Sequence, residues 1–125
     1  MLLLLFLNLA FSFKKEEPKV AWIRVNLLGY IPNGTKVAVW ASKTKEIPKE
    51  FQLVDSATGK VVYTGTAGAT FGAYGPFSET LRLNFTAYKK PGTYYLKSGN
   101  AVSPFFRIAN DVYAGTADFC LRYMR

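Results

Sequence analysis

From Lys19 onward, the chain is built of short segments in which apolar and polar residues alternate, with clusters of turn-forming residues between them. Successive side chains of a β-strand point to opposite faces of its sheet, so the alternation predicts strands with one buried face. No helical pattern interrupts the series. The seven predicted strands cover residues 20–25, 36–41, 51–54, 60–63, 77–85, 93–97 and 103–108.

The turns between these segments carry residues suited to reversing the chain. Asp55–Gly59 is a five-residue hairpin loop in which Asp starts the turn and Gly adopts positive φ, and Pro91 with Gly92 forms another turn. Many short strands joined by such turns predict an all-β fold, an Ig-like antiparallel β-sandwich over residues 20–109. Its buried face should carry the inward phase of two strands, with Trp40 facing the other way: Val37, Val39, Leu81, Leu83 and Phe85.

Composition excludes several kinds of site. Histidine is absent and cysteine occurs once, at Cys120, so Ser-His-Asp and Cys-His catalytic arrangements, His-containing zinc sites and an internal disulfide are ruled out. Half of the residues are hydrophobic, which argues against disorder and lets one domain of 125 residues hold by packing. The net charge of +8 comes largely from lysines in separated groups, a pattern typical of a solvated surface. We expect no metal, no cofactor and no nucleic-acid partner.

The start of the chain has the character of a leader. Residues 2–13 are apolar except for Asn8 and Ser12. The run is shorter than the about 20 residues that span a bilayer, and Ala10 with Ser12 offers a small-x-small cleavage site. A basic residue before the leucines is missing, but the alternative of a buried first strand is disfavoured because the run does not alternate. We predict a signal peptide at residues 1–13, no membrane segment after its cleavage, and a secreted or periplasmic location.

The periodicity changes after Asn110. Apolar residues then recur every three to four positions, which predicts an amphipathic helix over residues 110–125. Asp111 can cap its N-terminus, and Asp118 lies four residues before Arg122, the spacing of a helical ion pair. No Gly, Asn or Pro follows to end the helix, so we expect it to continue into a second, helical domain. One face of the helix carries an apolar stripe: Tyr113, Ala117, Cys120, Leu121 and Met124.

Several short motifs occur in a specific order along the chain. They are residues 23–38 (IRVNLLGYIPNGTKVA), 51–55 (FQLVD), 71–77 (FGAYGPF), 91–96 (PGTYYL), 103–108 (SPFFRI), 111–113 (DVY) and 117–125 (ADFCLRYMR). Together they resemble the Ig-like domain that precedes the catalytic domain of family 9 glycoside hydrolases, followed by the first helix of the catalytic (α/α)6 barrel. The resemblance covers residues 21–125. Family members commonly carry Gln where Leu27 stands, a departure that affects a local contact rather than the fold.

The resemblance implies a non-catalytic role for these residues. Family 9 enzymes hydrolyse β-1,4-glucan with inversion, using carboxyl groups of the barrel, and those groups would lie beyond Arg125. The resemblance therefore implies a non-catalytic module that braces the barrel of a cellulase, an endo-β-1,4-glucanase, with its own downstream catalytic domain as partner. Asp111 and Asp118 lie seven residues apart on the predicted helix, and Asp111 is better explained as a cap than as half of a catalytic pair.

The loop at residues 71–77 is rich in aromatic residues and glycines, and two interpretations of Phe71, Tyr74 and Phe77 remain open. Exposed aromatic rings stack on sugar rings, which would make the chain an independent carbohydrate-binding module for β-glucan. Alternatively, the three rings pack on the neighbouring barrel, because inter-domain surfaces are rich in aromatic residues. We favour the inter-domain contact.

Overall fold

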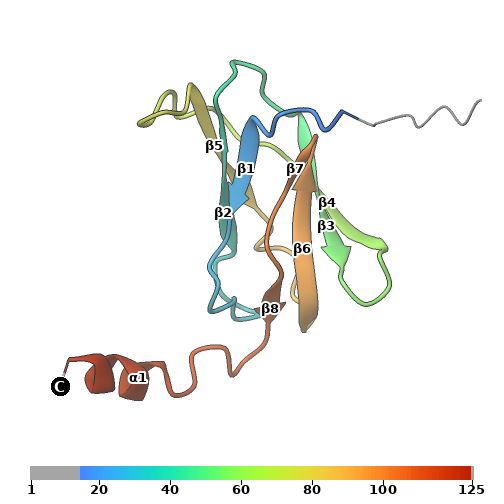
Figure 1. Ribbon diagram of the computed structural model, residues 1–125. Helices are drawn as coiled ribbons and strands as arrows, with labels where there is room; N and C mark the ends of the chain where they lie inside the picture. The colour runs from blue at the N-terminus through green and yellow to red at the C-terminus, as the bar shows by residue number, and fades with distance from the viewer. Residues whose placement is uncertain (1–14, 125) are drawn as a thin grey trace, which may run out of the picture.

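The computed structural model describes residues 15–124, and the predicted signal peptide at residues 1–13 lies outside this part of the chain. Eight strands and one helix follow one another within residues 15–124 (Figure 1). The strands are β1 Ala21–Arg24, β2 Val37–Ser42, β3 Glu50–Asp55, β4 Val61–Thr66, β5 Glu79–Asn84, β6 Gly92–Ser98, β7 Ala101–Val102 and β8 Phe106–Ile108, and the helix is α1 Thr116–Tyr123.

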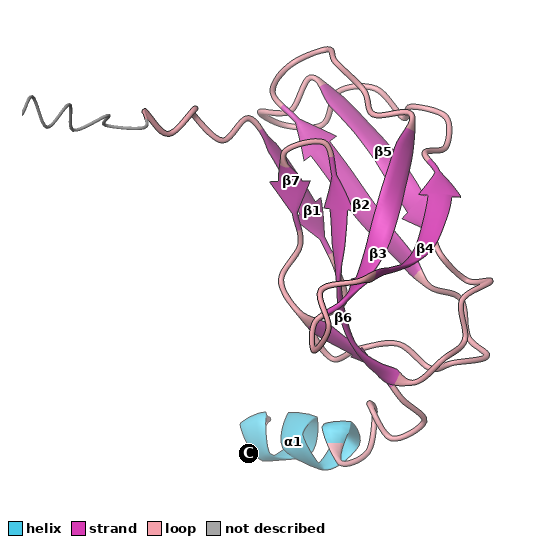
Figure 2. Ribbon diagram, turned by 90° about the vertical axis from the view of Figure 1, so that its right-hand side faces the viewer, coloured by secondary structure: helices cyan, strands magenta, loops and turns pink. Residues whose placement is uncertain are grey.

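The strands form two sheets that face one another (Figure 2). One sheet has the order β1-β2-β5, and the other has the order β4-β3-β6-β7 with β8 also paired to β6. Every pairing between these strands is antiparallel. The prediction of an all-β antiparallel sandwich followed by a C-terminal helix is therefore confirmed.

The core between the sheets is built around an aromatic cluster. The ring of Tyr30 meets Phe85 at 5.1 Å and Phe106 at 5.3 Å between centroids, edge-on in both cases. Such contacts contribute about 0.5–1.5 kcal/mol each beyond the burial of area. Leu81, Leu83 and Phe85 are buried, as predicted from the alternation in this segment. Because Phe85 follows β5 and Phe106 begins β8, the cluster joins one sheet to the other.

The predicted phase of β2 is wrong. Val39 is 42% exposed and Val37 is half-buried, whereas Trp40 is 4% exposed. Trp40 pairs across the strands with the buried Leu81, so its side chain points to the same, inward face. This strand has apolar residues in both phases, and alternation alone does not say which phase faces the core. Burying the indole removes more apolar area from water than burying a valine.

The last predicted strand, residues 103–108, is a strand only from Phe106 onward, and the short strand β7 lies before the predicted range. β7 ends at Val102, β8 begins at Phe106, and Pro104 lies in the gap. Proline has no N–H to give to a ladder, so it interrupts the pairing with β6. Ser103 partly replaces the ladder there, because its Oγ accepts a hydrogen bond of 2.8 Å from the N–H of Leu96.

The C-terminal helix begins later than predicted. α1 starts at Thr116 behind Gly115, whose φ of 76° lies in the left-handed region that favours glycine, and no side chain caps the helix. Asp111 does not cap it; its carboxylate pairs instead with Arg107 at 3.1 Å. In the described range, 15–124, Asp118 and Arg122 form no ion pair. No helix within this range is long and apolar enough to cross a membrane.

Candidate functional site

Loop 70–78 is held on the outer face of the β1-β2-β5 sheet by backbone hydrogen bonds. The N–H of Phe71 donates to the carbonyl of Thr80 at 2.8 Å, and the Thr80 hydroxyl donates to the carbonyl of Gly72 at 2.9 Å. Within the loop, Tyr74 and Phe77 exchange two N–H to carbonyl bonds of 3.0 Å. The loop is therefore a closed structure that fixes where its three aromatic rings point.

The three rings of this loop have different surroundings. Phe77 packs edge-on against Trp22 of β1, with 5.6 Å between ring centroids. Phe71 is 60% exposed and Tyr74 is 77% exposed. A hollow of about 420 Å³ lies between the loop and the strands, lined by Val39, Phe71, Tyr74, Thr80 and Arg82 among others. This volume lies in the range of about 300–1,000 Å³ that is typical of small-molecule sites.

A second surface lies at the opposite end of the sandwich, where the chain passes from β8 to α1 (Figure 1). The Tyr113 hydroxyl donates to the carbonyl of Gly29 at 3.2 Å and accepts a bond of 3.2 Å from the side-chain amide of Asn26. Gly29 itself packs so closely on Val112 that a Cβ at this position would lie 2.7 Å from the valine Cγ1. The segment before α1 is therefore fastened to the turn between β1 and β2.

The predicted apolar stripe does not contact the sandwich through the helix. Tyr113 lies before α1, and it is the member of the stripe that the sandwich holds. Ala117, Cys120, Leu121 and Met124 are all exposed, and no residue of α1 is buried. Phe119 and Tyr123, on the other side of the helix, are also exposed, at 71% and 88%. An isolated helix of eight residues is marginally stable in water, and helices in proteins are normally stabilised by packing of their apolar side chains. Within the described residues, α1 has no such packing.

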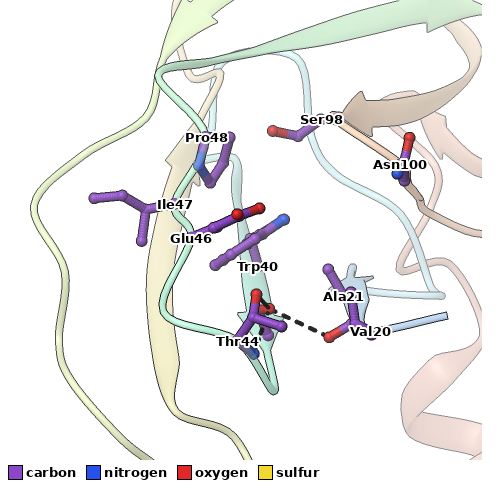
Figure 3. A pocket seen from close by; sticks show the side chains of 11 residues that line it. Val20, Ala21, Trp40, Thr44, Glu46, Ile47, Pro48, Ser98 and Asn100 are labelled. Atoms are coloured by element: carbon purple, nitrogen blue, oxygen red, sulfur yellow. Dashed lines mark hydrogen bonds between the residues drawn. The ribbon is translucent and has the colours of Figure 1, made fainter. Parts of the chain in front are cut away.

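A second concavity, of about 240 Å³, is lined by residues of β1, β2 and the turn at residues 98–100 (Figure 3). Trp40 lines it, and the Trp40 indole N–H is buried without a hydrogen-bond partner. The Ser42 hydroxyl donates to the carbonyl of Val20 at 3.3 Å, which ties β2 to the residue before β1. This volume falls below the range for ligand pockets, so the hollow beside loop 70–78 is the stronger candidate of these two.

The two carboxylates considered as a catalytic pair, Asp111 and Asp118, lie on either side of the start of α1. Asp111 forms an ion pair with Arg107 on the surface, where the Arg107 side chain is 57% exposed and the Asp111 side chain is 69% exposed. No group of three or more His, Cys, Asp or Glu side chains in residues 15–124 could hold a metal ion. The features that the structure brings together are surfaces for contact: an aromatic loop at one end and an anchored, apolar chain segment at the other.

Sequence reasoning identified the aromatic loop but missed the residues that hold it and the exit of the chain. Trp22 reaches loop 70–78 from the distant strand β1, Arg82 reaches it from β5, which directly follows the loop, and Asn26 reaches Tyr113 across 87 positions. Lys36 was also missed: it is fully buried, and its ammonium donates to the carbonyls of Ile31, Pro32 and Gly34. Burial, and to a smaller extent the charge of Lys89, lowers the pKa of Lys36.

Comparison with known proteins gives a consistent result. Residues 18–103 match the sequence model of a family described as the cellulase N-terminal Ig-like domain. The xyloglucan-specific endo-β-1,4-glucanase of Bacteroides ovatus is 38% identical over 102 residues, which are 80% of this chain and 16% of the relative. Endoglucanase D of Acetivibrio thermocellus is 37% identical over 93 residues, 73% of this chain and 14% of the relative.

A solved structure of a Bacteroides ovatus GH9 (glycoside hydrolase family 9) protein has a TM-score of 0.65 and 32% identity, over 81% of this chain and 18% of that one. The chain thus spans roughly a sixth of the length of the curated relatives that it matches. Fold and sequence agree on the same family of domains.

Proposed function

The chain belongs to the family of cellulase N-terminal Ig-like domains, and from this premise we propose that it is a non-catalytic module that braces the catalytic barrel of a secreted family 9 cellulase. On this proposal the whole protein hydrolyses β-1,4-glucan, as the Bacteroides ovatus relative is an endo-β-1,4-glucanase by name. The apolar run at residues 2–13 supports export. The partner is the downstream catalytic domain.

The observation that carries this proposal is the state of the residues around α1. The segment before the helix is fastened to the sandwich by Tyr113 and Val112, while the helix has apolar side chains on several sides, all exposed. An amphipathic helix of a globular protein normally packs its apolar face against a core. α1 is therefore best explained as an element that a neighbouring domain encloses, with Tyr113 fixing its position relative to the sandwich.

Exposed apolar residues of the sandwich lie next to this exit. Leu27 is 73% exposed and Leu28 is 52% exposed, in the turn that holds Tyr113 through Asn26 and Gly29. A domain tethered to the end of this segment meets these leucines at high effective concentration. They are the surface of the sandwich that we expect a barrel to cover.

The proposal can be tested in a chimera with a relative. The present chain replaces the matching segment of the Bacteroides ovatus endoglucanase, and the thermal unfolding of the catalytic domain is followed with and without the substitution Leu121→Asp. We expect the chimera to unfold at a temperature near that of the intact relative. Leu121→Asp should destabilise it by about 2–5 kcal/mol, because a charge would be placed in a packed core.

Arg122→Asp is the matched control, since it introduces the same carboxylate one position along α1, outside the stripe. It should shift the unfolding temperature far less than Leu121→Asp does. The bracing role would be contradicted if removing the whole Ig-like segment left the stability of the catalytic domain unchanged, or if the two aspartate variants behaved alike.

A further inference from the structure

The outer face of the β1-β2-β5 sheet carries two arginines on either side of a valine. Arg24 pairs with Val39, and Val39 pairs with Arg82, so the three residues form one row across the strands. Neighbouring strands lie about 4.8 Å apart, which places the two arginine backbones about 10 Å from each other on one face. The ion pair in the described residues, 15–124, joins Arg107 to Asp111, so no acidic side chain there neutralises either arginine of the row.

Arg82 is held in a defined position by loop 70–78. Its guanidinium lies over the ring of Phe71, 4.5 Å from the centroid, and the ring in turn is fixed by the Phe71 to Thr80 backbone bond. A guanidinium that stacks on a ring keeps its N–H edges available, and a planar fork of N–H donors matches the two oxygens of a carboxylate. The stacked Arg82 is therefore oriented to bind an anion through the N–H groups at the edge of its guanidinium.

The surroundings of this row are basic and aromatic. No Asp or Glu occurs in residues 70–78 or at the outward positions of the three strands, and Glu79 shares the inward phase of Leu81. Lys43 adds a third cation, 5.6 Å from the centroid of the Trp22 ring. Beside the row, the Tyr74 ring is 77% exposed and stands on a loop closed by two hydrogen bonds.

We propose that this face binds a polysaccharide whose sugar residues carry carboxylates, that is, a uronic-acid-bearing glycan. Tyr74 provides an exposed ring face for stacking on a pyranose, and Arg82 binds the carboxylate at the edge of the same hollow of about 420 Å³. Arg24 extends the positive row across the strands toward the next sugar. The stacking of the guanidinium on Phe71 keeps the ordering cost of binding low.

This site does not depend on the bracing role. Loop 70–78 lies at the end of the sandwich opposite to the exit toward α1 (Figures 1 and 2), so the loop can be altered without touching the segment that holds α1. Loss of bracing in the chimera and loss of glycan binding would therefore appear in different experiments with different variants. The two proposals stand or fail separately.

The test is binding of the full chain to soluble glucuronoxylan and to the same polymer after chemical reduction of its carboxyl groups, by isothermal titration calorimetry. The native polymer should bind, and the reduced polymer should bind about tenfold more weakly or worse, since a charge-assisted hydrogen bond is lost. Arg82→Gln should weaken binding of the native polymer by about the same factor. Tyr74→Ala should weaken both polymers by several-fold, because it removes the stacking ring rather than the charge.

Lys97→Gln is the matched control, since it removes one positive charge from an exposed position of β6 in the other sheet. Thermal melting of each variant establishes that it is folded, and Arg24→Gln provides a second probe of the row if Arg82→Gln is unstable. Equal loss of affinity in Lys97→Gln and Arg82→Gln would overturn the proposal, because binding would then reflect net charge alone. Tighter binding to the reduced polymer, to a neutral glucan or only to an acidic protein would also overturn it.

Discussion

The sandwich and the C-terminal helix contain similar apolar residues but use them in opposite ways. In the sandwich, Leu83 and Phe85 are fully buried. In α1, Leu121 is 57% exposed and Phe119 is 71% exposed. Periodicity identifies an apolar face equally well in both regions, but it does not say whether the covering partner belongs to the same domain. The comparison separates a core that is buried within these residues from a helix whose apolar side chains are exposed.

The largest contrast is expected from removing one aromatic ring in each region. Phe106→Ala should destabilise the chain by about 3–5 kcal/mol, because the ring is buried against Tyr30 and Phe85 and its loss leaves a cavity. Phe119→Ala removes the same group from an exposed helix and should change stability by less than about 0.5 kcal/mol. Urea unfolding of both variants measures the difference. Equal losses would mean that α1 belongs to the core of the sandwich.

Alkaline pH should also act on the sandwich and spare the helix. Burial, and then the hydrogen bond from Tyr88, raise the pKa of Tyr94, and burial raises that of Tyr30. The folded state therefore disfavours ionisation, while the same groups ionise near pH 10 in the unfolded chain. Their contribution to stability is full below about pH 10 and is lost as the pH rises through the folded values. Urea unfolding from pH 8 to 11 should show a decline above pH 10.

Substitutions of single tyrosines separate the causes of this alkaline decline. Tyr94→Phe cannot ionise and should flatten the decline, although it also loses the hydroxyl bonds to the carbonyls of Lys90 and Pro91. Tyr123→Phe, at an 88% exposed position of α1, should leave the curve as it is. Stability that stays constant from pH 8 to 11 would contradict the burial of these hydroxyls.

The smallest expected effect concerns the junction between the two regions. Tyr113→Phe removes the hydroxyl that bridges Asn26 and Gly29, and should cost about 0.5–1 kcal/mol, the low end for a partly exposed hydrogen bond. The helix itself should keep its amide exchange rates, because Tyr113 precedes α1. A loss above about 2 kcal/mol would show that the junction is part of the core. No measurable loss would remove Tyr113 from the bracing proposal.

Local patterns predicted much of the sandwich because each strand carries its own alternation and turns. Leu81, Leu83 and Phe85 were placed correctly, since polar residues occupy every position between them. β2 was placed in the wrong phase because apolar residues occupy both of its faces, and only its pairing with β5 decides between them. Pro104 was a local indication of the break between β7 and β8 that the strand prediction passed over.

The candidate surfaces were less predictable, because they depend on contacts between distant segments. The composition of residues 71–77 indicated a special loop, but the stacking of Arg82 on Phe71 follows from the way the loop folds back on β5. The Asp111 cap was wrong because α1 begins only at Thr116 behind Gly115, and the Asp111 carboxylate pairs with Arg107. Likewise, the bridge from Tyr113 to Gly29 spans 84 positions of sequence and has no local signature.

Hydrogen exchange on the chain tests most directly whether the two regions differ in the way proposed. Amides at residues 81–85 should be protected to nearly the global free energy of unfolding. This segment pairs with β2, and its side chains Leu81, Leu83 and Phe85 are buried between the two sheets. Amides at residues 119–124 should exchange close to unprotected rates, because α1 has no buried residue. Protection of α1 equal to that of β5 would contradict the division into a complete core and a helix that requires a partner.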